Sequence, residues 1–164
     1  TALVSIVDAP AVEAAIAAGV GNEVTVSVGA TLDSRFNQPL QVTGKVAAVA
    51  GGELQAEAVG LESFDMGRAV LLEIGNVKLV VSELRGIGSN HPIVFQQFGI
   101  DPGQAKMMVL KSSSNWQYYN PWLSEVVRVN TPGPTQSHLE ELEWTRIPRP
   151  TWPLDDLREW RAEV

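Results

Sequence analysis

The sequence predicts an α+β fold with a mainly antiparallel sheet, hairpins, a few short helices and an extended C-terminal tail rich in proline and tryptophan. Alternating apolar and polar residues over positions 23–28 are typical of a half-buried strand. The pairs Gly51-Gly52 and Gly75-Asn76 each interrupt an apolar run and predict tight hairpin turns. Proline and tryptophan recur after residue 130, where regular periodicity is lost.

The two hairpins define most of the expected sheet. Gly51-Gly52 separates the runs 41–50 and 53–59, and Gly75-Asn76 separates the runs 69–74 and 77–84. Both pairs permit the positive φ angles of primed two-residue turns. Because hairpins join antiparallel neighbours, these runs predict an antiparallel sheet.

The N-terminal residues predict a strand followed by a helix. Leu3–Val7 is an apolar, β-branched run, and Pro10 suits the first turn of a helix over 11–18 that ends at Gly19. The chain starts beside this strand with no initiator Met, cap or signal-peptide pattern. We therefore expect a longer parent protein that continues upstream.

The second half predicts shorter elements. A helix is expected over 93–98, a strand over 106–110, a helical segment from Ser112 to Leu123 that Pro121 kinks or restarts, and a last strand over 126–129.

We expect one domain over 1–164, with a globular body (1–130) and an extended tail (131–164) packed on it. Asp155 is expected to cap a final turn in which Leu157, Trp160 and Arg161 share a face, with the tryptophans buried. The proline-rich stretch 149–153 also resembles a ligand for an aromatic groove, although packing on its own domain is favoured.

Composition excludes several classes of partner. The formal net charge is −7, which argues against nucleic acid and anionic membranes because both require a field of Lys and Arg. No apolar stretch approaches the roughly 20 residues that a membrane-spanning helix needs. The chain has no cysteine, which excludes disulfides and thiolate metal sites and suits a cytoplasmic location.

Familiar catalytic motifs are missing. A protein zinc site takes three or four ligands, whereas the chain has two histidines, His91 and His138, and no cysteine. His138 lies in an acidic, solvated stretch, and His91 before Pro92 favours a capping or exposed imidazole. The stretch 86–91 fails as a nucleophile elbow because its final glycine is absent, and no phosphate-binding loop is present. No metal ligands and no catalytic residues are therefore assigned in this chain.

The best polar pair is Lys111-Ser112, which follows an apolar strand. Strand ends are where α/β proteins place functional side chains. A simple cap by Ser112 with a solvated Lys111 is an equal alternative.

Several stretches together resemble the C-terminal domain of the MlrC family, the microcystin-degradation group of zinc metallopeptidases. Their order and spacing span almost the whole chain. They are Ile6-Val7-Asp8-Ala9-Pro10-Ala11-Val12, Ala18-Gly19-Val20-Gly21, Asp65-Met66-Gly67-Arg68, Gly99-Ile100-Asp101-Pro102, Lys111-Ser112, Thr131-Pro132-Gly133-Pro134-Thr135, Arg149-Pro150 and Pro153-Leu154-Asp155.

The resemblance implies a parent with an upstream α/β domain that supplies the zinc ligands and performs metal-assisted hydrolysis of a peptide or amide. This chain would then be an accessory domain that completes the substrate cleft, inactive alone, with Lys111, Ser112 and Asn115 as substrate-facing candidates. Family members usually have His-Phe where this chain has Asn115-Trp116, and Asn cannot act as an acid or base near neutral pH. The alternative is a stand-alone protein-binding module without catalysis.

Overall fold

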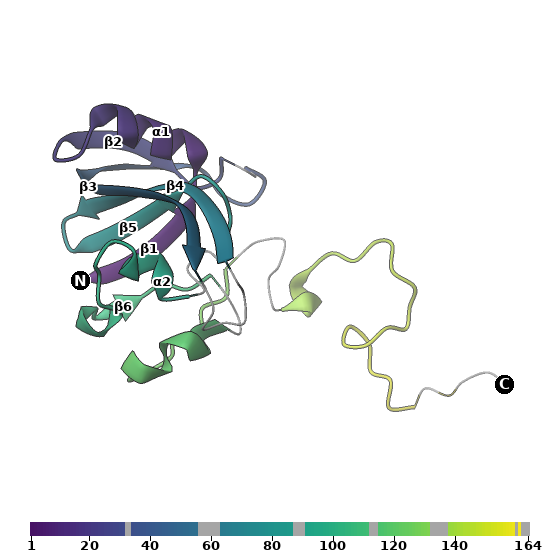
Figure 1. The fold of residues 1–164 in the computed structure, drawn as a ribbon. Helices are drawn as coiled ribbons and strands as arrows, with labels where there is room; N and C mark the ends of the chain where they lie inside the picture. The colour runs from purple at the N-terminus through teal and green to yellow at the C-terminus, as the bar shows by residue number, and fades with distance from the viewer. Residues whose placement is uncertain are drawn as a thin grey trace. The chain divides into compact units, whose positions relative to one another are not determined.

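The structure is a computed structural model that describes residues 1–31, 34–55, 63–86, 91–111, 115–131, 138–159 and 161. The chain divides into two compact units, Thr1–Glu125 and Val126–Val164. The first unit holds the sheet and is called the body below. The second, with a single short 3-10 helix among its described residues, is called the tail (Figure 1).

The body is built on one six-stranded sheet with the strand order β2-β3-β4-β5-β1-β6. The elements in chain order are β1 (Ala2–Val7), α1 (Ala9–Ala18), β2 (Glu23–Val28), β3 (Leu40–Gln55), β4 (Ser63–Ile74), β5 (Val77–Ser82), α2 (Ile93–Gln96), the 3-10 helix η3 (Pro102–Gln104), β6 (Met107–Met108), the 3-10 helix η4 (Asn115–Trp122) and, in the tail, the 3-10 helix η5 (Leu139–Glu141).

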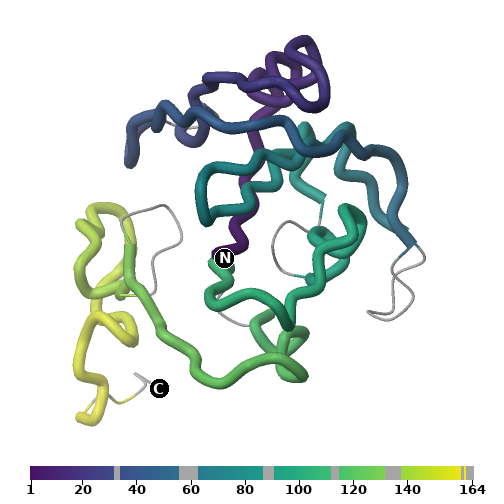
Figure 2. Tube along the Cα trace, turned by 90° about the vertical axis from the view of Figure 1, so that its left-hand side faces the viewer, coloured from purple at the N-terminus to yellow at the C-terminus, as the bar shows by residue number. Residues whose placement is uncertain are grey.

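The sheet is mixed, so the prediction of a mainly antiparallel sheet is wrong. Strands β2 to β5 pair antiparallel with their neighbours, but β1 lies between β5 and β6 and runs parallel to both. Figure 2 shows the N-terminal end of the chain close to the segment that carries β6. A hairpin between antiparallel strands leaves a turn signal in the sequence. Parallel strands are joined by long crossover connections, which leave no such local signal.

Of the two predicted hairpin turns, one is confirmed and one is wrong. Gly75-Asn76 joins β4 to β5, and Gly75 takes a φ of 55°. Gly51-Gly52 instead lies inside β3, where the pairing register with β4 shifts between Gly51 and Glu53. Gly52 takes a φ of 93°, which a bulge exploits as readily as a turn.

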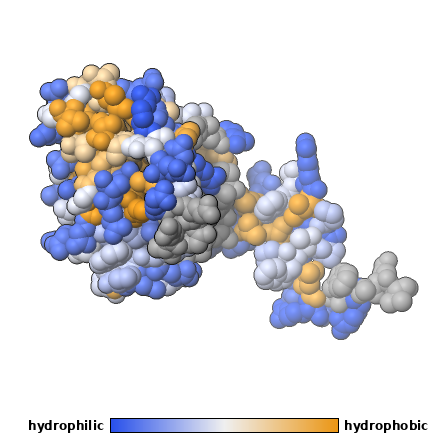
Figure 3. Space-filling view, viewed as in Figure 1, coloured by the Kyte–Doolittle hydropathy of each residue, from blue (hydrophilic) through white to orange (hydrophobic). Residues whose placement is uncertain are grey.

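One face of the sheet is covered by α1. Ala11, Val12 and Ala15 pack against a cluster of strand residues formed by Val26, Val28, Val46, Val70, Leu72, Leu79 and Val81. The outward side of α1 carries small residues such as Ala14 and Ala17, and Figure 3 shows hydrophobic surface at this end of the body. We call this the α1 face.

The opposite face is covered by short, irregular elements. Val94 and Phe95 of α2 and Tyr119 of η4 pack there against Leu3, Met66, Leu71 and Val80. We call this the α2–η4 face. Because successive strand residues point to opposite sides, Leu71 lies on this face while its neighbours Val70 and Leu72 lie on the α1 face.

Several predicted elements of the second half differ in the structure. The expected strand 106–110 shortens to Met107–Met108, although the backbone N–H of Val109 still donates to the carbonyl of Leu3 at 2.9 Å. The expected helix over 112–123 is η4, a 3-10 helix with Pro121 inside it. Residues 126–129 form no strand. Among the described residues, none of the helices combines the length and apolar character needed to cross a membrane.

Whether Asp155 caps a following turn stays a prediction. Its carboxylate accepts from Arg149 and from the backbone N–H of Thr151, which lie before it in the chain. The predicted partner Trp160 lies outside the described residues. How the tail packs, and whether its tryptophans are buried against the body, stays a prediction.

Candidate functional site at the carboxyl ends of the parallel strands

Two parallel strands, β1 and β5, end together at one edge of the body, while the third, β6, pairs with Ala2 and Leu3 at the start of β1. β1 and β5 finish side by side, with Val7 paired to Ser82 and the N–H of Asp8 donating to the carbonyl of Ser82 at 2.9 Å. The chain leaves β1 for the α1 face and leaves β5 for the α2–η4 face. In open α/β sheets such a divergence opens a crevice at the carboxyl ends, where ligands bind. We call this edge the carboxyl rim.

Asp8, directly after β1, connects α1 to the segment after β2. It is fully buried, and one carboxylate oxygen accepts from the N–H of Ala11 at 3.3 Å, which caps α1. The other oxygen accepts from the N–H of Gly29 at 3.1 Å and the hydroxyl of Thr31 at 2.9 Å. These donors satisfy the polar atoms of the buried side chain, so Asp8 is structural here.

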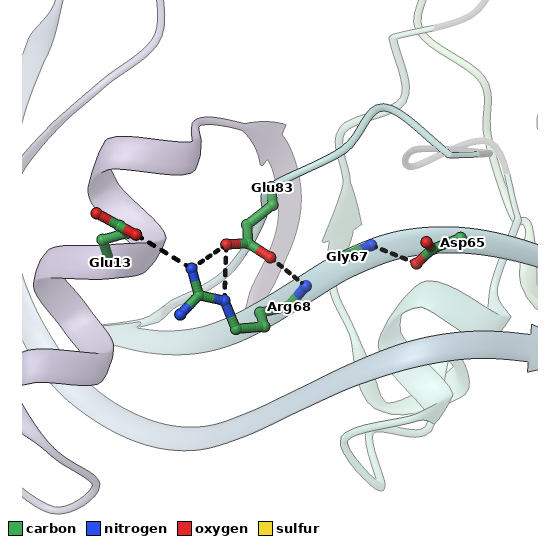
Figure 4. A network of polar contacts seen from close by, with 5 residues as sticks. All are labelled: Glu13, Asp65, Gly67, Arg68 and Glu83. Carbon is green, nitrogen blue, oxygen red and sulfur yellow. Dashed lines mark hydrogen bonds and ion pairs between the residues drawn. The ribbon is translucent and has the colours of Figure 1, made fainter.

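On the α1 face of the rim, an arginine is held between two carboxylates (Figure 4). Arg68 of β4 donates to Glu83, just after β5, through its backbone N–H at 2.6 Å and its Nε at 2.7 Å. Its Nη2 also pairs with Glu83 and, at 3.2 Å, with Glu13 of α1. The hydrogen bond from Arg68 lowers the pKa of Glu83, and the bond to Glu83 raises the pKa of Arg68.

The local backbone explains why Arg68 reaches Glu83. Asp65 accepts from the N–H of Gly67 at 2.7 Å, and Gly67 takes a φ of 63°. A Cβ on Gly67 would lie 2.9 Å from the Cβ of Glu83. Glycine therefore lets β4 turn Arg68 to the α1 face, while Met66 packs on the other face. This gives the stretch Asp65-Met66-Gly67-Arg68 a physical role.

The predicted candidates Lys111, Ser112 and Asn115 follow β6 in the chain, and their place at the rim stays a prediction. Lys111 is exposed and follows β6, which runs parallel to β1 and therefore points to the same edge. Asn115 is half-buried and begins η4. Ser112 lies outside the described residues. The structure thus puts Lys111 at the carboxyl end of an edge strand, and a substrate-facing role for the three residues stays a prediction.

His91 and Tyr118 lie where α2 and η4 meet. The Nδ1 of His91 accepts from the N–H of Ile93 at 3.2 Å, the capping role expected from its position before Pro92. The rings of His91 and Tyr118 meet edge to face, with centroids 5.0 Å apart. Burial lowers the pKa of His91.

The residues that the structure describes do not fit a zinc centre. They contain no group of three or more His, Cys, Asp or Glu side chains arranged to hold a metal ion. His91 already uses Nδ1 as an acceptor, and His138 is an exposed residue of the tail, 3.3 Å from Glu140.

Sequence reasoning missed the Arg68 network and the contact between His91 and Tyr118. The first had a signal, because an Asp-x-Gly-Arg stretch combines an Asx turn with a glycine and a cation. The second had none, since His91 and Tyr118 lie far apart in the sequence and only tertiary packing brings their side chains together. Asp8 also had a signal as an Asp directly before a helix with Pro10 in its first turn.

A family model described as MlrC C-terminus matches residues 1–146. The chain is similar to a protein named Microcystinase C from Sphingomonas sp, with 27% identity over 110 residues that cover 67% of this chain and 21% of the relative. A solved structure of a "putative metallopeptidase" from Mesorhizobium sp. BNC1 has the same fold, with a TM-score of 0.78, 21% identity, and coverage of 95% of this chain and 31% of the other.

Both relatives are much longer than this chain, which covers 21% of the first and 31% of the second. Their names describe the whole proteins. The match of the family model over most of the chain, in contrast, concerns the domain itself. The chain belongs to the family of MlrC C-terminal domains.

Proposed function

We propose that this chain is the accessory C-terminal domain of an MlrC-like metal-dependent peptide or amide hydrolase. It completes the substrate cleft of a longer parent, and the upstream part of that parent supplies the metal ligands, with zinc as the metal. The observation that carries this proposal is the family match over residues 1–146, combined with the small share of the relatives that the chain covers. The names of both relatives, Microcystinase C and a metallopeptidase, support a hydrolase.

Two different roles are proposed for the carboxyl rim, a structural role around Arg68 and a substrate-binding role around Lys111. On the α1 face, Arg68 is neutralised by Glu13 and Glu83, so that half is suited to holding the edge in place. On the other half, Lys111 is exposed at the end of β6. An ammonium group there can orient a substrate carboxylate, and the neighbouring Ser112 and Asn115 can add neutral hydrogen bonds.

Two measurements test the proposal. The chain alone should bind Zn²⁺ no better than a generic acidic surface and should hydrolyse no peptide. The parent should bind Zn²⁺ stoichiometrically and should hydrolyse a peptide. Stoichiometric, sub-micromolar zinc binding by the chain alone in calorimetry would contradict an accessory role. A parent that binds no metal and cleaves no peptide would instead favour a stand-alone protein-binding module.

Two further parts of the proposal concern the setting. We place the protein in the cytoplasm, which the absence of cysteine supports. Its proposed partners are the upstream domain of the same parent and a peptide substrate, and no nucleic acid or membrane. Fractionation of cells that express the tagged parent tests the location directly.

A further inference from the structure

The hydrogen bond of His91 fixes which ring nitrogen carries its proton. Nδ1 accepts the N–H of Ile93 at 3.2 Å, so the lone pair of Nδ1 is occupied and a neutral ring carries its proton on Nε2. Among the hydrogen bonds of the residues that the structure describes, Nε2 takes part in none. His91 therefore presents an unused N–H donor.

The position of this donor is set by η4. The His91 ring lies against Tyr118, with centroids 5.0 Å apart and an angle of 61° between the rings. Side chains three residues apart eclipse in a 3-10 helix, so Asn115 and Tyr118 share one side of η4. His91 is thus placed beside the side of η4 that begins with a predicted site residue.

Two effects keep the imidazole uncharged near neutral pH. Burial lowers the pKa of His91. Protonation at Nδ1 would also replace the acceptor of the Ile93 N–H by a donor and lose that bond. A neutral ring with a fixed tautomer suits a neutral acceptor, such as a carbonyl oxygen, rather than a carboxylate.

We propose that His91 belongs to the substrate-binding surface and donates a hydrogen bond from Nε2–H to a peptide carbonyl oxygen of the substrate. Asn115 and Tyr118 flank the same contact. This inference rests on the proposed function and deepens it, because it assigns a backbone carbonyl to His91 and leaves a substrate carboxylate to Lys111. His91 holds and orients the substrate, and no proton transfer is assigned to it.

The chemistry of Asn and Gln provides a matched pair of variants. The H91N side chain can still accept from the Ile93 N–H but does not reach the place of Nε2. The H91Q side chain reaches that place with an amide donor but gives up the acceptor at the place of Nδ1. A binding role and a purely capping role therefore predict opposite outcomes.

The experiment uses the parent protein with two probes, an alanine tetrapeptide blocked at both ends and the same peptide with a free carboxylate. H91N should lose about tenfold in kcat/KM on both probes, the loss expected for one neutral hydrogen bond, with thermal stability unchanged. H91Q should retain most of the activity and lose stability. K111A should lose activity on the free carboxylate alone.

Each alternative result has a definite meaning. Full activity of H91N with loss in H91Q, or wild-type kinetics in both, would reduce His91 to a cap and overturn the inference while the proposed function stands. An inactive wild-type parent would overturn the proposed function and the inference with it. Independently of activity, ¹⁵N NMR of the chain should show the Nε2–H tautomer for His91. The Nδ1–H tautomer would overturn the inference.

Discussion

The two faces of the sheet are closed in different ways. The α1 face is covered by one regular ten-residue helix whose buried residues are Ala11, Val12 and Ala15. The α2–η4 face is covered by a four-residue helix and 3-10 turns, with the larger side chains Phe95 and Tyr119 fully buried. Small residues let a helix pack close and leave little room for function, whereas irregular segments bring polar groups to the rim.

The two faces therefore differ in where polar groups remain available for function. Ionic groups on the α1 face satisfy one another, as Arg68 does with Glu13 and Glu83. On the α2–η4 face, the proposed substrate-facing residues are Lys111, Asn115 and His91. If the comparison is right, substitutions on the first face change stability, and those at the polar end of the second change activity.

The largest effect is expected from emptying the core of each face. Y119A should lower the free energy of unfolding by about 3–5 kcal/mol and L72A by about 2–5 kcal/mol, because both side chains are fully buried. Urea denaturation measures both, with Y119F as a control that keeps the ring. A cost below about 1 kcal/mol for Y119A would show that the α2–η4 face is loosely packed.

The next effect concerns the buried carboxylate under the rim. D8A removes the cap of α1 and leaves the N–H of Gly29 and the hydroxyl of Thr31 without their acceptor. We expect a loss of about 2–4 kcal/mol, the sum of a cap and of unpaired polar groups. D8N keeps one acceptor oxygen and should lose less. Equal losses in thermal denaturation would count against this arrangement.

A smaller effect distinguishes two glycines with positive φ. G52A should cost about 1–2 kcal/mol, because its φ of 93° is strained for alanine but its surroundings are open. G67A should cost more, since its Cβ would also lie 2.9 Å from the Cβ of Glu83. Chemical denaturation of both variants gives the difference. Equal costs would mean that Gly67 is not needed to bring Arg68 to Glu83.

The smallest predicted effect is a pH dependence on the α2–η4 face. The folded-state pKa of His91 is lowered from 6.5 by burial. The unfolded chain therefore takes up a proton first, and stability is lost as pH falls below about 6.5 until the folded-state pKa is passed.

Carboxylates also contribute to acid unfolding, so the prediction concerns the difference between wild type and H91Q. The melting temperature of wild type should fall more than that of H91Q between pH 8 and about pH 5.5. Calorimetry at both pH values measures it. Parallel curves for the two proteins would remove His91 as a source of the pH dependence.

The α1 face could largely be predicted from the sequence, and the other face only in part. The run Leu3–Val7, the helix that ends at Gly19 and the turn at Gly75-Asn76 follow from local signals. The insertion of β1 between β5 and β6 could not be predicted, because no local pattern encodes a parallel pairing across the chain. The predicted hairpin turn at Gly51-Gly52 was wrong because a glycine with positive φ occurs in β-bulges as well as in turns.

The candidate site divides in the same way. Lys111 was predicted from its place after an apolar run, and it does follow an edge strand, although a shorter one than expected. The ion pair between Arg149 and Asp155 gives a physical reason for two stretches of the resemblance, and it lowers the pKa of Asp155 to about 2. His91 and Tyr118 needed the tertiary structure, because only packing of η4 on α2 brings their rings together.

The most direct test of the central claim uses the two lysines that precede and follow β6. Lys111 follows β6 on its carboxyl side, whereas Lys106 precedes β6, where its N–H donates to the carbonyl of Thr1 at 2.9 Å. In the parent protein, kcat/KM for a short peptide with a free carboxylate should fall about tenfold or more in K111A and remain unchanged in K106A, with the same melting temperature in both. Equal activity of K111A and wild type, or a loss that follows a drop in stability, would contradict a substrate-facing carboxyl rim.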